Sequence, residues 1–212
     1  MPRSKTGLQS TITRKQGVTI TFSQPPPPEI YAHIPLPASA LCAVKFEFSG
    51  AVEYDTGLHF HADKGEALRV ESGAILVQLG KEILRVTRET GEVTIPRYIV
   101  HRWWIPADAK GETVVWERTL PGSQEKEAFF RTLVSYIGDL PSGPPSFFQL
   151  YAIFSRWDNY PVLGTWCTWG PGARLVVTWT HVLGALGRML GYQPTYAEYL
   201  PREIHGIAGY VT

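Results

Sequence analysis

The chain has 212 residues, of which 44% are hydrophobic and 18% charged, a composition typical of a folded protein and not of a disordered one. Its formal net charge is +1 and it has no long basic run, which excludes nucleic acid as an expected partner, because phosphate binding needs clustered lysine and arginine. The length suffices for one core domain with an extension.

Cysteine usage and the N-terminal segment indicate the compartment. The two cysteines, Cys42 and Cys167, are too few for a disulfide framework and are interpreted as small core residues in a reducing environment. The first segment, MPRSKTGLQSTITRKQG, is polar and basic and lacks the apolar region of a secretory signal. We therefore expect a flexible arm over residues 1–17 and an intracellular, cytoplasmic protein.

Residues 18–120 carry an almost continuous strand signal. Short alternating or β-branched segments, from VTITF at residue 18 to ETVVWERTL at residue 112, are separated by turn residues, with a stiff PPPP spacer at residues 25–28. LGKE around Gly80 and RETGE around Gly91 are typical of hairpin turns. This pattern predicts a mostly β fold, a sandwich or barrel of the jelly-roll kind.

Residues 121–212 change to a helical period. Helices are predicted over residues 123–138 and 146–157, and a third ends at Gly191. The third helix carries apolar residues spaced by four and three: Leu175, Trp179, Val182, Leu186 and Met189. Its apolar segment is too short for a spanning helix, which needs about 20 residues. We expect it to pack on the barrel or at a dimer interface, and a peripheral membrane contact is the alternative.

The segment GLHFHADKGEALRVESG holds two histidines on alternate positions. Side chains alternate along a strand, so His59 and His61 share a face, and Glu66 can reach the same point from the next strand. His101, at the end of GEVTIPRYIVH, begins a returning strand and can supply a fourth ligand. The alternative is a set of ordinary strand histidines that only bond one another.

These two segments resemble the two cupin motifs. The spacing His59-x-His61-x4-Glu66-x6-Gly73 matches the first motif, and GEVTIPRYIVH is similar to the second, with Pro96 and His101 in register. The second segment departs in having one residue fewer between Gly91 and Pro96, Tyr98 in place of a small residue and Ile105 in place of an asparagine. The resemblance covers about residues 43–120 and implies a single cupin jelly-roll barrel, with domain bounds 18–120, and a helical C-terminal region over 121–212.

Three imidazoles and one carboxylate predict one divalent transition metal. Such a mixed nitrogen and oxygen set suits Fe, Mn, Ni, Cu or Zn and does not suit Ca or Mg. Four protein ligands leave one or two positions open on the ion, as catalysis requires. Glu66 is expected to remain a ligand or to act as a base, and Tyr98 to offer a hydroxyl beside the site.

Strand parity predicts the pocket lining. Trp103 and Ile105 share the face of His101, and Leu68 and Val70 share that of Glu66. On the strand VVWER, parity leaves two choices open: Val114, Trp116 and Arg118 face inward, or Val115 and Glu117 do. In the first case Trp116 and Arg118 would contact the substrate, Arg118 holding an oxygen or carboxylate.

The whole chain is also similar to small cupin proteins of fungal secondary metabolism. This resemblance implies a tailoring enzyme that acts on a small hydrophobic, polyketide-like metabolite, with oxidation by dioxygen as the first expectation. The alternatives are redox-neutral cyclisation, isomerisation, dehydration or decarboxylation through a metal-bound enolate, and a ligand-binding cupin without catalysis. By analogy with cupins we expect a homodimer, with residues 18–22 as a candidate exchanged edge strand.

Overall fold

A computed structural model describes residues 11–14, 17–24, 43–50, 52–162, 164 and 170–209. The polyproline segment, both cysteines and residues 1–10 of the expected arm lie outside these ranges. Within them, Thr11–Arg14 form strand β1, which pairs with Val18–Gln24, strand β2. These four residues of the expected arm therefore form a strand, and Thr11, Ile12 and Thr13 are of the β-branched type that strands favour.

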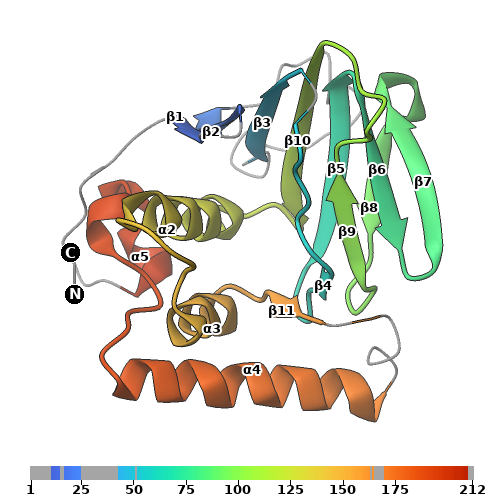
Figure 1. Ribbon diagram of the computed structural model, residues 1–212. Helices are drawn as coiled ribbons and strands as arrows, with labels where there is room; N and C mark the ends of the chain where they lie inside the picture. The colour runs from blue at the N-terminus through green and yellow to red at the C-terminus, as the bar shows by residue number, and fades with distance from the viewer. Residues whose placement is uncertain are drawn as a thin grey trace.

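Two antiparallel sheets enclose the core (Figure 1). The larger sheet has the order β1-β2-β3-β10-β5-β8 and the smaller one β11-β4-β9-β6-β7. The remaining strands are β3 Ala43–Ser49, β4 His59–Phe60, β5 Gly65–Ser72, β6 Ala74–Leu79, β7 Glu82–Thr87, β8 Glu92–Ile95, β9 His101–Trp104, β10 Glu112–Leu120 and β11 Tyr160–Pro161. Alternate residues of strands in both sheets, such as Phe46 of β3 and Val77 of β6, fill the space between the sheets.

Of the two predicted hairpins, one is confirmed and one is wrong. Strands β6 and β7 pair across Gly80, which has a φ of 61°. The RETGE segment instead forms a short 3₁₀ helix, η2 Arg88–Thr90, and leads from β7 in the smaller sheet to β8 in the larger one. Turn residues mark where a strand ends, but they do not say which sheet receives the next strand.

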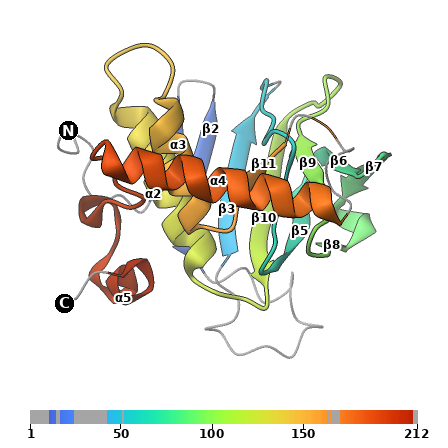
Figure 2. The ribbon, with the colours of Figure 1, turned by 90° about the horizontal axis from the view of Figure 1, so that it is seen from below.

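Three helices follow the barrel, as the sequence predicts. They are α2 Glu125–Asp139, α3 Phe147–Arg156 and α4 Pro171–Met189. Helix α2 lies beside the β1–β3 end of the larger sheet, α3 lies between α2 and α4, and α4 runs along the outside of the molecule (Figures 1 and 2). The short elements η4 Ala197–Tyr199, η5 Arg202–Ile204 and α5 His205–Ala208 end the described chain.

Helix α4 packs through a different face from the apolar stripe that the sequence pattern singled out. Its buried residues include Thr180, Leu183 and Gly187, whereas Leu175 is 69% and Met189 83% exposed. The stripe therefore does not pack on the barrel, and a dimer or membrane contact through it stays a prediction. No helix within the described ranges is both long enough and apolar enough to cross a membrane.

Candidate metal centre

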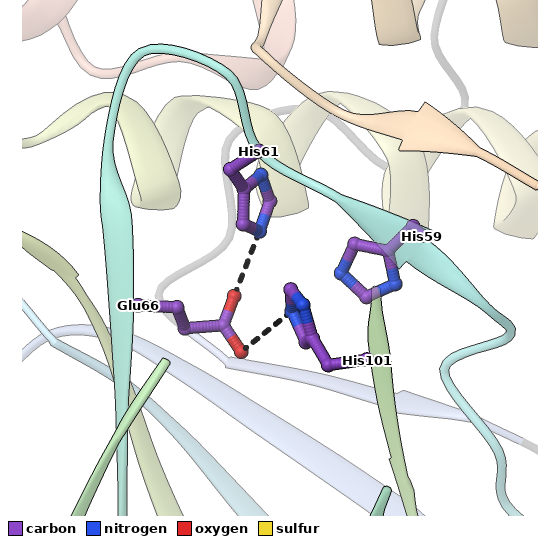
Figure 3. A group of neighbouring side chains, drawn as sticks. All are labelled: His59, His61, Glu66 and His101. Carbon is purple, nitrogen blue, oxygen red and sulfur yellow. Dashed lines mark hydrogen bonds and ion pairs between the residues drawn. The ribbon is translucent and has the colours of Figure 1, made fainter. Parts of the chain in front are cut away.

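The four side chains predicted as metal ligands converge between the two sheets (Figure 3). His59 begins β4 and His101 begins β9, and these two residues pair across the smaller sheet. Glu66 is the second residue of β5 in the larger sheet. Because side chains alternate along β4, Phe60 points the other way and stacks on Tyr160.

The four groups are close enough to share one ion. One possible ligand atom from each lies within 4.8 Å of the others, and all four residues are buried. The ring centroids of His59 and His101 are 4.3 Å apart, and those of His61 and His101 are 5.3 Å apart. The structure thus brings together the residues that the two motifs single out, while their binding of a metal stays a prediction.

Backbone carbonyls orient all three imidazole rings. The Nδ1 atoms of His59, His61 and His101 lie 2.8, 2.5 and 2.9 Å from the carbonyl oxygens of Gly57, Asp158 and Ile99, respectively. A carbonyl oxygen only accepts, so each Nδ1 carries the proton and donates it. In the neutral rings the Nε2 lone pairs are therefore free, which is the tautomer that a metal site requires.

The centre of the cluster contains facing acceptors. Glu66 Oε1 and His101 Nε2 are buried without a hydrogen-bond partner among the described residues, and they lie 3.6 Å apart. His61 Nε2 lies 3.0 Å from Glu66 Oε2. Buried polar atoms normally have partners, and a cation between these acceptors would satisfy them. The donor set therefore fits a transition metal better than calcium or magnesium, which take oxygen ligands.

Burial and neighbouring charges hold His59, His61 and Glu66 in the protonation states that bind metal. Burial, reinforced by His101, lowers the pKa of His59 well below its usual value, and burial with the Lys126 ammonium lowers the pKa of His61. Burial alone would raise the pKa of Glu66, but Lys126 and His101 outweigh it and hold that pKa well below its usual range. The neutral His59 and His61 and the ionised Glu66 are the forms that ligate metal.

Asp158, just after α3, fixes the loop that carries His61. Its carboxylate accepts hydrogen bonds from the backbone N–H groups of Ala62, Asp63 and Lys64 at 2.8 to 3.1 Å, and its carbonyl orients the ring of His61. Asp158 has a φ of 52°, a left-handed conformation that aspartate tolerates. The helical region thus controls the connection between His59 and Glu66.

A cavity of about 210 Å³ adjoins the cluster at His59. Helices α2 and α3 supply most of its apolar wall, through Phe129, Phe130, Leu133 and Phe154. Glu117 and Asn159 are among its polar lining residues. The cavity therefore offers an apolar, aromatic space beside the candidate metal position.

The predicted pocket lining is only partly correct. Trp103 and Ile105, and likewise Leu68 and Val70, point inward as parity predicts, but all four belong to the packed hydrophobic core and none lines the described cavity. Trp103 is fully buried between Phe46, Phe48 and Tyr54. The barrel interior is filled by its own side chains, and the described cavity lies toward the helices.

The structure also settles the choice on strand β10. Val115 and Glu117 face inward, because Glu117 bonds Trp103 Nε1 at 3.0 Å. Trp116 and Arg118 lie on the opposite face of the sheet, where Trp116 donates to Glu71 and Arg118 pairs with Glu92 at 2.7 Å. Their positions therefore give no support to the substrate-binding role predicted for Trp116 and Arg118.

Tyr98 lies at the rim of the barrel. Its side chain is 41% exposed and its ring centroid lies 5.9 Å from that of Phe60, which points away from the cluster. The backbone has a φ of 63°, and its N–H donates to the carbonyl of His61. This position supports a role in holding the turn and gives no support to the predicted catalytic hydroxyl.

Two residues near the cluster, Lys126 and Asp158, were not singled out from the sequence, and a third, Glu117, was named only as one of two alternatives on its strand. Lys126 of α2 bonds Glu66 and Glu117 at 2.6 and 2.8 Å. The alternation of side chains along the strand gave Glu117 as a possible inward residue, so the sequence did contain a signal for it. Lys126 lies in the charged run QEKE, which reads as an exposed first turn, and nothing in the sequence indicates that it enters the barrel.

Several curated fungal proteins are similar to this chain, although no family model matches it. The "Probable oxidoreductase patJ" of Aspergillus clavatus is 27% identical over 94% of this chain and 65% of its own length. The "Probable oxidoreductase virH" of Hypocrea virens is 32% identical over 67% of this chain and 66% of its own length. The "Epoxidase atD" of Aspergillus terreus is 28% identical over 67% of this chain and 46% of its own length. The chain thus spans about half to two thirds of these relatives.

Solved structures give more distant likenesses. KdgF from Halomonas aligns with 51% of this chain and 84% of its own length at 16% identity, with a TM-score of 0.36. A predicted oxalate decarboxylase from Thermotoga maritima aligns with 54% of this chain and 93% of its own length at 12% identity, with a TM-score of 0.35. Independently of these likenesses, both motif segments meet inside one antiparallel barrel, as the sequence resemblance requires. The fold and the four clustered side chains are therefore those that the resemblance to cupins implies.

Proposed function

We propose that this chain is a metal-dependent tailoring enzyme that oxidises a small hydrophobic, polyketide-like metabolite with dioxygen. The observation that carries the proposal is the buried cluster of His59, His61, Glu66 and His101, in which carbonyl bonds place each ring proton on Nδ1. A structural site would be closed, whereas four protein ligands leave a position for substrate on a five- or six-coordinate ion.

The chain's own residues have separable roles in this proposal. The four residues of the cluster would hold the ion, which would supply Lewis acidity and, if it is iron, dioxygen chemistry. Phe129, Phe130 and Leu133 would bind the apolar body of the substrate and exclude water from the cavity. Glu117, at the cavity wall, would present a carboxylate toward a hydroxyl of the substrate.

The relatives favour oxidation over the redox-neutral alternatives. Two of them are named probable oxidoreductases and one is named an epoxidase, and all three come from fungi. The aromatic cavity supports a flat apolar substrate. Redox-neutral chemistry and ligand binding without catalysis remain as outcomes that the experiment distinguishes.

Elemental analysis of the purified protein tests the metal. We expect close to one transition-metal ion per chain in the wild type and its loss in the His59→Ala/His61→Ala double variant. Oxygen uptake with a panel of hydrophobic enols and phenols then tests the reaction, and it should follow iron loading. Turnover without oxygen would replace oxidation by redox-neutral chemistry, and turnover by protein stripped of metal would overturn the proposal.

A further inference from the structure

Lys126 is a buried lysine that reaches the candidate metal centre from outside the barrel. It is the second residue of α2, and its Nζ lies 2.6 Å from Glu66 Oε2 and 2.8 Å from Glu117 Oε1. The other oxygen of Glu117 accepts a hydrogen bond from Trp103 Nε1 at 3.0 Å. A chain of charge-assisted bonds therefore links Trp103, Glu117 and Lys126 to Glu66.

This ammonium is held in its charged form. Its Nζ lies between one carboxylate oxygen of Glu66 and one of Glu117, so it is paired with two acidic groups. An ammonium has donors only, so Lys126 stays bonded to acceptors. A buried charge that keeps its ion-pair partners is tolerated in the folded protein, whereas a buried charge without a partner destabilises the fold.

The bond fixes which oxygen of Glu66 faces the histidines. Oε2 accepts from Lys126 and lies beside His61, while Oε1 has no hydrogen-bond partner in the described structure and faces His101 Nε2. A carboxylate that is free to rotate would lose this orientation. In metal sites, a hydrogen bond to the ligating carboxylate is the usual means of fixing its orientation.

We propose that Lys126, held in place by Glu117, is a positioning residue that orients Glu66 for metal binding, so that helix α2 completes a centre whose ligands all come from the barrel. This inference rests on the proposed metal site.

A competing effect has the opposite sign. Lys126 could weaken metal binding by repelling the cation and occupying Glu66. The geometry argues against this outcome, because Lys126 engages Oε2 of Glu66 and leaves Oε1, which faces His101 Nε2, open to the cation. Without the ammonium, two buried carboxylates would face each other, and one of them would protonate or turn away.

The test is Zn²⁺ affinity of the full chain, measured by competition with a chromogenic chelator. Zn²⁺ is redox-inert and accepts imidazole and carboxylate ligands, so no substrate is needed. We expect Lys126→Met to bind Zn²⁺ about 10–100-fold more weakly than the wild type, the loss typical of groups that orient metal ligands. Lys126→Arg keeps the charge and the donors, and we expect it to recover most of the affinity.

A matched control comes from the same helix. Arg131 of α2 is also buried and pairs with Glu127, away from the cluster, so Arg131→Met removes a comparable ion pair and should leave Zn²⁺ affinity unchanged. Lys126→Gln, which keeps a donor without the charge, gives a second and milder test if Lys126→Met does not fold, and we expect a several-fold loss.

The outcomes separate the two proposals. Wild-type protein that binds Zn²⁺, with affinity equal or higher in the folded Lys126→Met or Lys126→Gln variant, would overturn the positioning role and leave the metal site intact. Wild-type protein that binds no Zn²⁺ would remove the metal site and this inference together.

Discussion

Each histidine of the cluster is oriented by a carbonyl rather than by another side chain. For His61 that carbonyl belongs to Asp158, 97 residues further along the chain, whose carboxylate also binds three backbone N–H groups of the same loop. A single residue of the helical region thus sets both the path of the loop and the direction of the ring. This arrangement makes Asp158 the residue outside the barrel on which His61 most depends.

Asp158→Gly should therefore weaken Zn²⁺ binding by about 10–100-fold, because it removes the carboxylate that holds the loop. Glycine adopts the φ of 52° without strain, so the backbone conformation is conserved and only the side chain is lost. Competition titration measures the change. Asp63→Gly adds similar flexibility to the same loop and serves as the control. Equal affinity of Asp158→Gly and the wild type would contradict the role assigned to this carboxylate.

The acid limit of metal binding follows from the lowered pKa values of His59 and His61. An unperturbed imidazole is half protonated at a pH of about 6.5, whereas these two buried rings stay neutral there. We expect the protein to retain its full Zn²⁺ content at this pH and to lose it only in more acidic solution. Metal content after gel filtration at a series of pH values measures this, and a midpoint at or above about 6.5 would contradict it.

At the residue scale, the sequence predicted what lies within two short segments and missed what acts from a distance. His59, His61 and Glu66 lie in one short segment of the sequence, so local alternation and spacing suffice to place them together. Lys126 is 60 residues from Glu66, and its charge gives the same signal as that of an exposed helix residue. Only the tertiary packing of α2 distinguishes the two.

At the scale of elements, the crossing of α3 and α4 depends on two glycines. A Cβ on Gly184 would lie 2.2 Å from Ser155 Oγ, and one on Gly187 would lie 2.6 Å from the carbonyl oxygen of Phe148. The backbone of α3 is in van der Waals range at that point and cannot rotate away as a side chain can. The two helices therefore approach more closely than side chains of ordinary size permit.

Gly187→Ala should destabilise the protein by about 1–3 kcal/mol, the usual cost of an added methyl group in a packed contact. Gly138 in α2 is the matched control, since a Cβ there meets nothing within 4 Å. Alanine at Gly138 should leave stability unchanged or raise it by up to about 1 kcal/mol, because alanine is the better helix former. Urea unfolding measures both variants, and equal stability of Gly187→Ala and the wild type would contradict the close approach.

The periodicity of the sequence predicts whether most elements are strands or helices, but it does not predict which faces of these elements pack together. The segments that became β2, β3, β5, β6, β7, β8 and β10 were all predicted as strands, as were the three helices. The apolar stripe of α4 was interpreted as its packing face, but glycine and other small residues on the opposite face allow the closer contact. Hydrophobicity marks a face that can be buried, and steric fit decides which face is buried.

At the scale of the whole molecule, the barrel and the helical region share one functional site. The barrel supplies the four candidate ligands, α2 supplies Lys126, the end of α3 leads into Asp158, and both helices line the cavity. The sequence divides at Pro121 into two regions of different period, and every site residue predicted from the sequence lies in the first of them. The structure shows instead that the two regions meet at the cluster.

Zn²⁺ binding should accordingly stabilise both regions. At a free concentration about 100 times the Kd, a ligand that binds only the folded state adds about 2.7 kcal/mol, which raises the Tm of a chain of this size by about 5–10 °C. The His59→Ala/His61→Ala double variant should show no such shift.

Because Lys126 and Asp158 contact the cluster, hydrogen exchange should slow on Zn²⁺ binding at the start of α2 and around Asp158 as well as in β4 and β5. The C-terminal half of α4 packs on α3 away from the cluster, so its amides should exchange at the same rate with and without Zn²⁺. Protection from exchange that is confined to the barrel strands would contradict a site shared between the two regions.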